Sequence, residues 1–469
     1  MEGTPPREGD DVLPLAPSQE ALWEFLKYFS PRDPGGAPFN VSDYRQLDGV
    51  MHLESLCRAV SDVARRHDFL RIAFTDLTCD PGVRITSGTE PDISFVDLSG
   101  RPDRARTERL RDLVAAGWQR GYDVLRAPLW SVCVVRLSSC RHVVIVSLCH
   151  LVADGWSLGV FFDDLMTAYA ARCDDGPVPE PVGITFQDVA EAQRRAQSAA
   201  PGEDPLPHSG PVSPALLFPV RARPGDEPTA EARCPFSFGP ELTLKVRALA
   251  RELRTTPFVL LFSAYQICLR QRTGLDGLRF GTVTLGRRAR GYARLVGQFT
   301  TNVYVMSAAH PRTSLREAVG ETHRRLERAT SREWSFRRVA REVHPGFVAE
   351  RPWPFLHLFH SWFQAGPPAS ARTTRTGGLT VSRPPSLDEQ PREPATVLPT
   401  AVPGALELWA KRGAPSITLN NRREGGDVTY DPRFFDGGMV AHFAADYVHV
   451  VRSVVDEPDG LVGRVTLSP

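Results

Sequence analysis

The chain has little of what marks a membrane, secreted or polyanion-binding protein. Its 469 residues carry a formal net charge of +1, which argues against bulk binding to nucleic acid or to an anionic membrane. No stretch approaches the roughly 18 consecutive apolar residues that a transmembrane helix requires. The N-terminal sequence MEGTPPREGDDV has no apolar core and is therefore not a signal peptide.

Closely spaced cysteines are also missing. The eight cysteines are scattered, and none forms a Cys-x-x-Cys pair. This pattern predicts reduced thiols in a cytoplasmic protein, with no zinc or other metal site. A composition of 42% hydrophobic and 24% charged residues is typical of a soluble globular chain. The length allows two or three domains, or one large unit with two lobes.

Helix and strand patterns alternate along residues 1–196, which predicts an α/β lobe. The clearest patterns are helices at about 53–66 and 104–120, and strands at about 130–137 and 142–149. Residues 197–232 are dense in proline, glycine and charge, and they predict an exposed linker. Residues 233–469 then form a second lobe.

In the second lobe, apolar periodicity predicts helices at 256–271, 312–342 and 434–454, and strands at 278–283 and 355–363. A loop-to-strand segment is expected at 297–305, and two strands are expected within 406–430. Residues 364–404 are rich in proline, threonine and serine, and they predict a long loop.

The segment RHVVIVSLCHLVADGWS, residues 141–157, is the most informative part of the chain. The β-branched run 143–146 predicts a buried strand, whereas the apolar residues that follow Gly155 recur at helical spacing. His150 therefore lies just beyond a strand end, in a turn that leads into a helix. Such junctions place a side chain at the rim of a sheet, where a ligand can reach it.

Residues 149–155, CHLVADG, resemble the HHxxxDG signature of the condensation-domain acyltransferases of nonribosomal peptide synthesis, with Cys149 in place of the first histidine. Other elements similar to that family's motifs recur in the same order, at 14–23 (PLAPSQEALW), 70–74 (LRIAF), 122–129, 256–288 and 297–302 (GQFTTN). The resemblance covers nearly the whole chain. It implies an α/β fold of two chloramphenicol-acetyltransferase-like lobes, arranged as a V-shaped pseudo-dimer around a central tunnel.

The resemblance assigns the chemistry to His150, where the acyl donor and the acceptor would meet. An imidazole suits proton transfer near neutral pH, and the family's histidine acts either as general base or by positioning the acceptor nucleophile. Asp154 is expected to be architectural rather than a proton carrier, paired with Arg287 or, failing that, with Arg288, because a buried carboxylate needs a cationic partner. Gly155 has three possible roles: it adopts a positive φ, it allows a pantetheine arm to approach closely, or it is an ordinary turn residue ahead of the helix.

Cys149 is the departure from the motif. A cysteine beside a histidine suggests a nucleophilic dyad, but adjacent residues on a strand point to opposite faces. We therefore expect Cys149 to be a buried structural residue that faces away from His150. The family's first histidine is itself regarded as structural.

Further residues are candidates for the substrate tunnel. Trp156 and Ser157 follow the motif, where packing and helix capping are the alternative roles. Asn302 belongs either to a loop that closes the tunnel or to a structural turn. His360 and Trp362 share one strand face, which lines the acceptor side or belongs to the core. The arginines of 312–341 form a solvated helix face or a dock for an anionic carrier protein.

The sequence thus predicts a free-standing condensation enzyme that works with partners in trans. It would hold no cofactor of its own and would take an acyl or aminoacyl group from the phosphopantetheine of an acyl or peptidyl carrier protein. The acceptor would be an amine or an alcohol, free or carrier-bound. Two alternatives remain open: a related O-acyltransferase that uses carrier or coenzyme A donors, and a non-catalytic condensation-like domain that recruits another enzyme.

Overall fold

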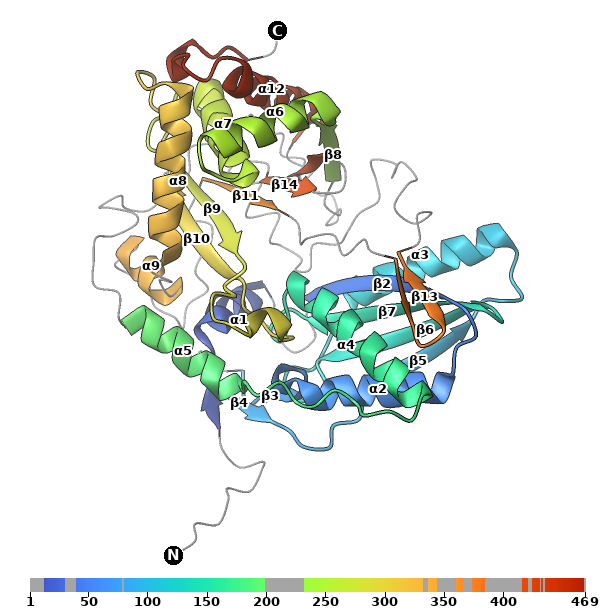
Figure 1. Ribbon diagram of the computed structural model, residues 1–469. Helices are drawn as coiled ribbons and strands as arrows, with labels where there is room; N and C mark the ends of the chain where they lie inside the picture. Colours follow the sequence, from blue (N-terminus) through green and yellow to red (C-terminus); the bar gives the residue numbers. More distant parts are fainter. Residues whose placement is uncertain are drawn as a thin grey trace, which may run out of the picture. The chain divides into compact units, whose positions relative to one another are not determined.

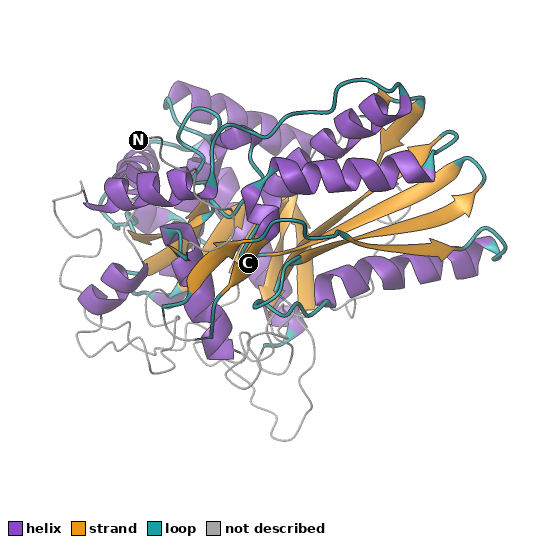
Figure 2. Cartoon of the chain, turned by 90° about the horizontal axis from the view of Figure 1, so that it is seen from below, coloured by secondary structure: helices purple, strands orange, loops and turns teal. Residues whose placement is uncertain are grey.

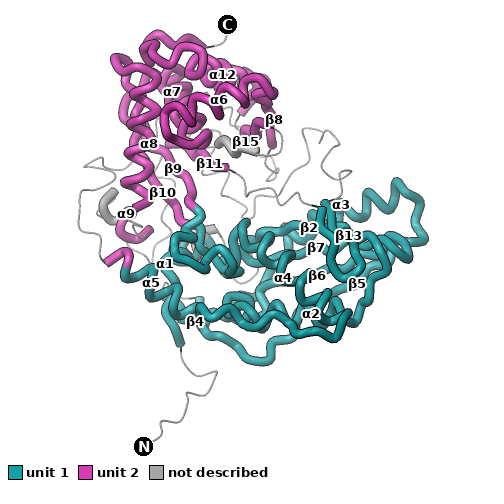
Figure 3. Tube along the Cα trace, in the orientation of Figure 1, with its two compact units in different colours: residues 1–195, 285–300, 370–392 teal, residues 196–284, 301–369, 393–469 magenta. Residues whose placement is uncertain are grey.

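Figure 1 presents a computed structural model of the chain, which describes residues 12–29, 39–77, 80–198, 232–331, 336–343, 360–365, 373–383, 416–420, 424–430, 432 and 435–467. The chain forms two compact units (Figure 3): unit 1 contains residues 1–195, 285–300 and 370–392, and unit 2 contains the rest. Each unit combines helices with a six-stranded sheet, which confirms the predicted α/β class. The V-shaped placement of the two lobes around a tunnel stays a prediction.

The main sheet of unit 1 has the strand order β12-β13-β2-β7-β6-β5. Its strands are β2 (Asn40–Asp48), β5 (Asp92–Asp97), β6 (Trp130–Ser138), β7 (Arg141–Cys149), β12 (Thr374–Thr376) and β13 (Leu379–Ser382). Among these six described strands, β5 and β6 form the one parallel pair. A second sheet contains β1 (Leu13–Pro14), β3 (Ile72–Phe74) and β4 (Gly82–Ile85). The helices are α1 (Pro17–Phe29), α2 (Leu53–Arg66), α3 (Asp103–Gln119), α4 (Gly155–Cys173) and α5 (Phe186–Ser198).

Helices cover both faces of the main sheet (Figure 2), and strand β7 shows how the sequence produces this. Val144, Val146 and Leu148 belong to the apolar cluster that includes residues of α2 and α4. Val143 and Ile145 belong to the cluster that includes Leu110 of α3. Because successive residues of a strand point to opposite faces, a continuous apolar run such as VVIV suits a strand that is buried on both sides.

Unit 1 also contains a hairpin that lay inside the predicted 364–404 loop. β12 and β13 are joined by Gly377 and Gly378, which both have positive φ, as a tight two-residue hairpin requires. β13 pairs with β2 and buries Leu379 and Val381. The expectation of a structureless loop was therefore wrong for 374–382. The Gly-Gly pair followed by alternating Leu-Thr-Val-Ser was the signal that could have revealed it.

The described part of unit 2 has the strand order β10-β9-β11-β14-β15-β8. These strands are β8 (Ala232–Ser237), β9 (Arg279–Thr284), β10 (Thr301–Met306), β11 (Ser361–Ala365), β14 (Ser416–Asn420) and β15 (Gly425–Tyr430). The helices are α6 (Gly239–Glu252), α7 (Pro257–Thr273), α8 (Leu315–Ser331), α9 (Phe336–Val343) and α12 (Gly437–Asp456). One apolar cluster joins residues of α6, α7, α8 and α12 to the sheet.

The predicted contiguous halves differ from the observed units in one important respect. Residues 285–300 leave unit 2 after β9, pack within unit 1, and return to unit 2 at β10. Residues 370–392 likewise cluster with unit 1. The expected single helix at 312–342 is divided between α8 and α9. Most of the predicted linker, residues 199–231, and most of the predicted strand at 355–363 lie outside the described residues.

In the part of the chain that the structure describes, no helix is both long enough and apolar enough to cross a membrane.

The β13 hairpin should contribute measurably to stability. Replacing Leu379 by alanine removes a side chain that is 1% exposed, and such a truncation lowers the free energy of unfolding by about 2–5 kcal/mol. Thr374 of β12 is exposed, so Thr374→Ala is the matched control and should change stability by less than about 0.5 kcal/mol. Urea denaturation measures both. Equal effects of the two substitutions would show that the hairpin does not support the sheet.

Candidate active site

His150 lies at the first position beyond β7. Its backbone N–H donates to the Phe39 carbonyl at 2.7 Å, which continues the β2–β7 pairing by one residue. The Phe39 ring lies against the imidazole, with 5.2 Å between centroids. The sheet therefore holds the backbone of His150 and leaves the side chain at the sheet edge, where it is partly buried.

The hydrogen bond of the imidazole fixes its tautomer. His150 Nδ1 lies 2.8 Å from the Ala153 carbonyl oxygen, and a carbonyl oxygen can only accept. Nδ1 therefore carries the proton, and in the neutral ring Nε2 presents a lone pair. The turn that follows the strand thus prepares one nitrogen of His150 to accept a proton.

Burial sets the charge state of this ring. Desolvation is the largest influence and lowers the pKa of His150 below its usual 6.5, whereas the Ala153 carbonyl, the negative charge of Asp154 and the side chain of Gln298 act in the opposite direction. The lowered pKa keeps the imidazole neutral at neutral pH. In that form Nε2 is available as a base.

Asp154 begins helix α4 as its N-cap. Its side chain accepts a hydrogen bond from the Ser157 backbone at 2.9 Å, and the Ser157 hydroxyl lies 3.3 Å from the Asp154 backbone N–H. This reciprocal arrangement is a capping box, with serine in the position where glutamate is more usual. The cap fixes the direction of α4 relative to the turn that holds His150.

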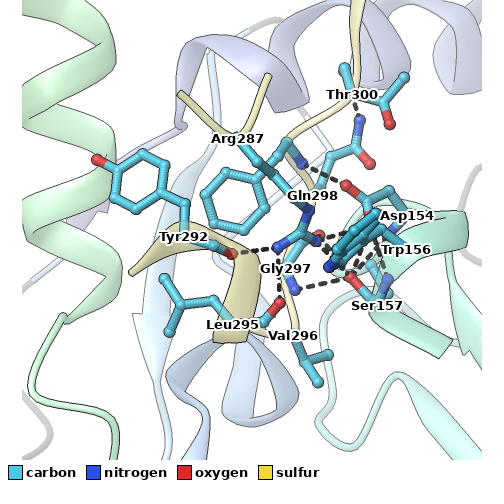
Figure 4. A network of polar contacts seen from close by, with 12 residues as sticks. Asp154, Trp156, Ser157, Arg287, Tyr292, Leu295, Val296, Gly297, Gln298 and Thr300 are labelled. Carbon is cyan, nitrogen blue, oxygen red and sulfur yellow. Dashed lines mark hydrogen bonds and ion pairs between the residues drawn. The ribbon is translucent and has the colours of Figure 1, made fainter. Parts of the chain in front are cut away.

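Arg287 forms the ion pair that the resemblance implied for Asp154 (Figure 4). Arg287 Nη2 donates to Asp154 Oδ1 at 2.8 Å, and the two side chains are 4% and 0% exposed. Asp154 Oδ2 accepts from the Phe299 backbone at 3.3 Å. Both carboxylate oxygens are therefore occupied and shielded from solvent. This geometry favours the architectural role of Asp154 over proton transfer.

The same guanidinium organises the segment that crosses from unit 2. Arg287 Nη1 donates to the carbonyl groups of Tyr292 and Leu295 at 2.5 and 2.8 Å. Its Cζ atom lies 4.2 Å from the centroid of the Phe299 ring. The Ser157 hydroxyl oxygen accepts from the Gly297 backbone N–H at 3.0 Å. Residues 287–299 are thus folded around one arginine and attached to the start of α4.

Cys149 faces the side of the sheet opposite to the α2–α4 cluster. It pairs directly with Asn40, and paired residues share a face. The Asn40 side chain donates to the carbonyl groups of Gly117, Trp118 and Arg120 at the end of α3. Cys149 is 3% exposed, and burial raises its pKa to about 12. The thiol is therefore protonated at neutral pH, which opposes a nucleophilic dyad with His150.

Comparison of the sequence with protein-family models identifies the family of this chain. Residues 10–344 match the model described as "Condensation domain", which covers well over half of the chain. The chain belongs to the Condensation domain family. Condensation domains of this family are amide-forming acyltransferases of nonribosomal peptide synthetases, and this chain is of that general kind.

Curated relatives agree with this assignment. The chain is 28% identical over 349 residues to phosphinothricin tripeptide synthetase PhsB of Streptomyces viridochromogenes, a match that covers 73% of this chain and 29% of that protein. The chain thus corresponds to less than a third of the length of that synthetase.

Two solved structures show the same fold. The SgcC5 protein from Streptomyces globisporus is 24% identical, with a TM-score of 0.71, and the match covers 96% of this chain and 100% of that one. The X-domain from teicoplanin biosynthesis is 18% identical, with a TM-score of 0.75, and the match covers 100% of this chain and 99% of that one. At these identities both establish the condensation-domain fold and nothing more.

The residues that follow the motif of this condensation domain have mainly structural contacts. Gly155 is the first residue of α4 and is not among the described glycines with positive φ, so positive φ is ruled out among its three alternatives and the other two stay open. Ser157 is fully buried in the capping box, which confirms its capping role and makes it a poor tunnel residue. Trp156 Nε1 donates to the Ala293 carbonyl at 2.9 Å. Its place in a tunnel stays a prediction.

Asn302, His360 and Trp362 all belong to unit 2. Asn302 is partly buried on β10. His360 Nδ1 accepts from the Arg279 backbone at 2.9 Å, and Trp362 Nε1 donates to Gln364 Oε1 at 3.0 Å. These contacts suit structural side chains at the edges of β9 and β11. Their contact with substrate stays a prediction.

Sequence reasoning gave no role at the site to three buried polar residues that surround the turn at 150–154: Ser18, Gln19 and Gln298. The Gln19 side chain donates to the Leu151 carbonyl at 2.8 Å, and the Ser18 hydroxyl donates to the Gln298 carbonyl at 2.6 Å. Only the occurrence of Ser18 and Gln19 in the opening motif, and of Gln298 in the GQFTTN motif, could have indicated them. No local pattern predicts contacts between residues 280 positions apart.

Breaking the Asp154–Arg287 pair should destabilise the protein strongly. Asp154→Ala and Arg287→Ala each leave a buried charge without its partner, which lowers the free energy of unfolding by about 3–5 kcal/mol. The double substitution should lose less than the sum of the two. Chemical denaturation of the four proteins measures this coupling.

The control is the exposed pair Arg58–Glu54, whose side chains are 63% and 78% exposed. Its double-mutant cycle should give a coupling below about 0.5 kcal/mol. Strictly additive losses at Asp154 and Arg287, or an Asp154→Ala protein that keeps full stability but loses activity, would instead indicate a catalytic carboxylate.

Cys149→Ala should keep most of the activity, because a protonated buried thiol takes no part in the transfer. Brief iodoacetamide treatment of the unsubstituted protein should likewise leave turnover unchanged. Mass spectrometry during turnover provides the opposing test: an acyl group covalently attached to Cys149 would demonstrate a two-step mechanism.

Proposed function

We propose that this chain transfers an acyl or aminoacyl group from the phosphopantetheine thioester of a partner carrier protein to an amine or an alcohol. The observation that carries the proposal is the state of His150: Nδ1 is committed to the Ala153 carbonyl at 2.8 Å, and the pKa lies below its usual range because the ring is desolvated. A neutral imidazole with a free Nε2 at the motif position of a condensation domain supports proton transfer from the acceptor.

The proposed reaction is a direct transfer. The nucleophile attacks the thioester carbonyl carbon, a new C–N or C–O bond forms, and the proton of the nucleophile moves to His150 Nε2. The C–S bond then breaks, and the departing thiolate takes up the proton, which regenerates the neutral imidazole. The protein contributes the orientation of the reactants and one base of suitable pKa. Asp154 stays paired with Arg287 throughout and takes no part in the transfer.

Free-standing action on a carrier protein in trans belongs to the same proposal. Two solved structures of similar proteins support alternatives to amide formation by this chain. The SgcC5 structure contains (R)-(-)-1-(2-naphthyl)-1,2-ethanediol, and a diol bound to a relative of similar length favours an alcohol acceptor and ester formation. The X-domain of teicoplanin biosynthesis forms a complex with OxyB, which favours the recruitment alternative.

Intact-mass spectrometry of a loaded carrier protein separates these possibilities. The carrier is loaded with an acyl group and mixed with the purified chain and with matched amine and alcohol acceptors, and a parallel reaction uses the same acyl group on coenzyme A. Loss of the acyl mass with formation of amide or ester identifies the acceptor class. Absence of transfer to every acceptor, with tight binding of a partner enzyme, would support recruitment instead.

His150→Ala should lower turnover about 10²- to 10⁴-fold, the range expected when an acid–base group is lost. The fold should remain, because the imidazole makes a single hydrogen bond, through Nδ1, to the residues that the structure describes. His142→Ala is the matched control: His142 is a buried histidine at the other end of the same strand. Its turnover should stay within about twofold of the unsubstituted protein. Normal turnover in a folded His150→Ala protein would overturn the assignment.

A further inference from the structure

The crossing segment, residues 285–300, is attached to the rest of unit 1 at Val296 as well as at the Asp154–Arg287 pair. Val296 is fully buried, and its side chain belongs to the apolar cluster that includes residues of α2 and α4. Its backbone N–H donates to His67 Nδ1 at 3.3 Å. A buried backbone N–H requires an acceptor, and here a titratable imidazole supplies it where a carbonyl group would be usual.

The contacts of His67 determine where its proton lies. Because the Val296 N–H can only donate, His67 Nδ1 holds a lone pair in the neutral ring, and the proton lies on Nε2. His67 Nε2 therefore donates to Asp164 Oδ2, which is 2.7 Å away. The imidazole has no exposed surface. It thus connects a carboxylate of α4 to a backbone amide of the crossing segment.

Helix α4 supports two consecutive amides of the crossing segment. Ser157 and Asp164 lie about two helical turns apart, so they share a face of the helix. The Ser157 hydroxyl oxygen accepts from the Gly297 N–H at 3.0 Å, and Asp164 holds the preceding amide through His67. A β-carbon at Gly297 would lie 2.9 Å from the Phe69 ring. The segment therefore passes close to the turn that follows His67.

Protonation of His67 would abolish its contact with Val296. An imidazolium carries a proton on both nitrogens, so Nδ1–H would face the Val296 N–H, and two donors cannot form a hydrogen bond. We propose that His67 is a pH-sensitive positioning residue, whose neutral ring attaches the crossing segment next to the candidate active site and whose protonation at Nδ1 by solvent releases Val296. Asp164 would keep its contact with Nε2–H, so the loss is confined to the segment.

Burial and the charges around His67 set the pH of this change. Burial is the largest influence and lowers the pKa of His67 below its usual 6.5, so the ring is neutral at neutral pH. Asp164 of α4 and Asp68 of the 3-10 turn favour protonation, whereas Arg66 at the end of α2 opposes it. The Asp164 oxygen also accepts from Arg66 Nε at 2.9 Å. The crossing segment presents the uncharged amide of Val296 to the ring.

The first test is hydrogen–deuterium exchange of the full chain, followed by mass spectrometry of peptides that cover 291–299. Exchange is measured in steps from about pH 7.5 to about pH 4.5, where circular dichroism shows that the chain is still folded, and is corrected for its intrinsic pH dependence. Protection of the segment should fall about tenfold on the acid side, the effect of one lost hydrogen bond. Protection that stays constant after the correction would overturn the proposal.

Two substitutions separate titration of His67 from a purely structural role. His67→Asn keeps an acceptor oxygen near the position of Nδ1 and does not titrate, so the acid-induced loss of protection should disappear. Asp164→Asn keeps an oxygen for Nε2–H and removes the negative charge, so the pKa of His67 should fall and the loss should move to lower pH. An unchanged pH dependence in both variants would overturn the proposal. If His67→Asn does not fold, Asp164→Asn decides alone.

His142→Asn is the matched control. His142 is another buried histidine of unit 1, and burial lowers its pKa as well. His150→Ala is the second control, because His150 also has a lowered pKa. Both variants should keep the acid-induced loss of protection at 291–299. If the loss disappears in either control, the effect belongs to a histidine other than His67, and the proposal is wrong.

The tautomer of His67 tests the resting contact directly. The full chain is labelled with ¹⁵N-histidine and observed by two-bond ¹H–¹⁵N correlation, and His67→Asn identifies the signal of His67. At neutral pH, His67 should show the Nε2–H tautomer, opposite to the Nδ1–H tautomer expected for His150. An Nδ1–H tautomer of His67 would overturn the proposal. Neither experiment needs a substrate, so both results stand even if the proposed acyl transfer is wrong.

Discussion

The ion pair between Asp154 and Arg287 is the interaction on which the rest of the site depends. One guanidinium satisfies a fully buried carboxylate and at the same time binds the carbonyl groups of Tyr292 and Leu295. The carboxylate in turn caps α4 through Ser157. Because each partner would be an uncompensated buried charge without the other, the segment 287–299 and the start of α4 have only one favourable arrangement.

The ion pair affects the surroundings of His150 in two ways. Asp154 ends the short turn that begins at the strand end, so the cap of α4 fixes the position of the Ala153 carbonyl, which holds His150 Nδ1 at 2.8 Å. Arg287 shapes the crossing segment, which contacts the end of the same turn through the Phe299 backbone and Asp154 Oδ2. The ion pair thus takes no part in proton transfer, yet through the Ala153 carbonyl it helps to determine which nitrogen of His150 is free.

Local patterns in the sequence predicted the local structure well. Helix α2 has the predicted bounds 53–66, and β6, β7 and α3 lie within a residue or two of the predicted bounds. The pairing of Asp154 with Arg287 was also predicted correctly, because a buried carboxylate requires a cation and the family motif supplied the candidate. The pleat of a strand predicted that Cys149 would face away from His150, and the structure places its partner Asn40 against the end of α3.

Features that depend on distant contacts could not be predicted in the same way. Residues 285–300 join unit 1 through tertiary contacts, which leave no periodicity in their own sequence. The hairpin of β12 and β13 did leave a signal, but a surrounding stretch rich in proline and threonine outweighed it. Ser18, Gln19 and Gln298 meet the motif turn only after folding, so their roles at the site needed the structure.

The replacement of the first motif histidine by Cys149 is compatible with activity in this account, since that position contributes packing on the α3 face and the proton-accepting atom is His150 Nε2.

The most direct test of His150 as the base is the pH dependence of kcat/KM for acyl transfer, measured with an acceptor that does not itself titrate between about pH 5 and 8. The account predicts a rate that is constant at neutral pH and falls on the acid side with a midpoint below 6.5, the ordinary value for histidine, because burial lowers the pKa of His150. A midpoint above 6.5, or a rate that does not fall in acid, would contradict the assignment of His150 as the base.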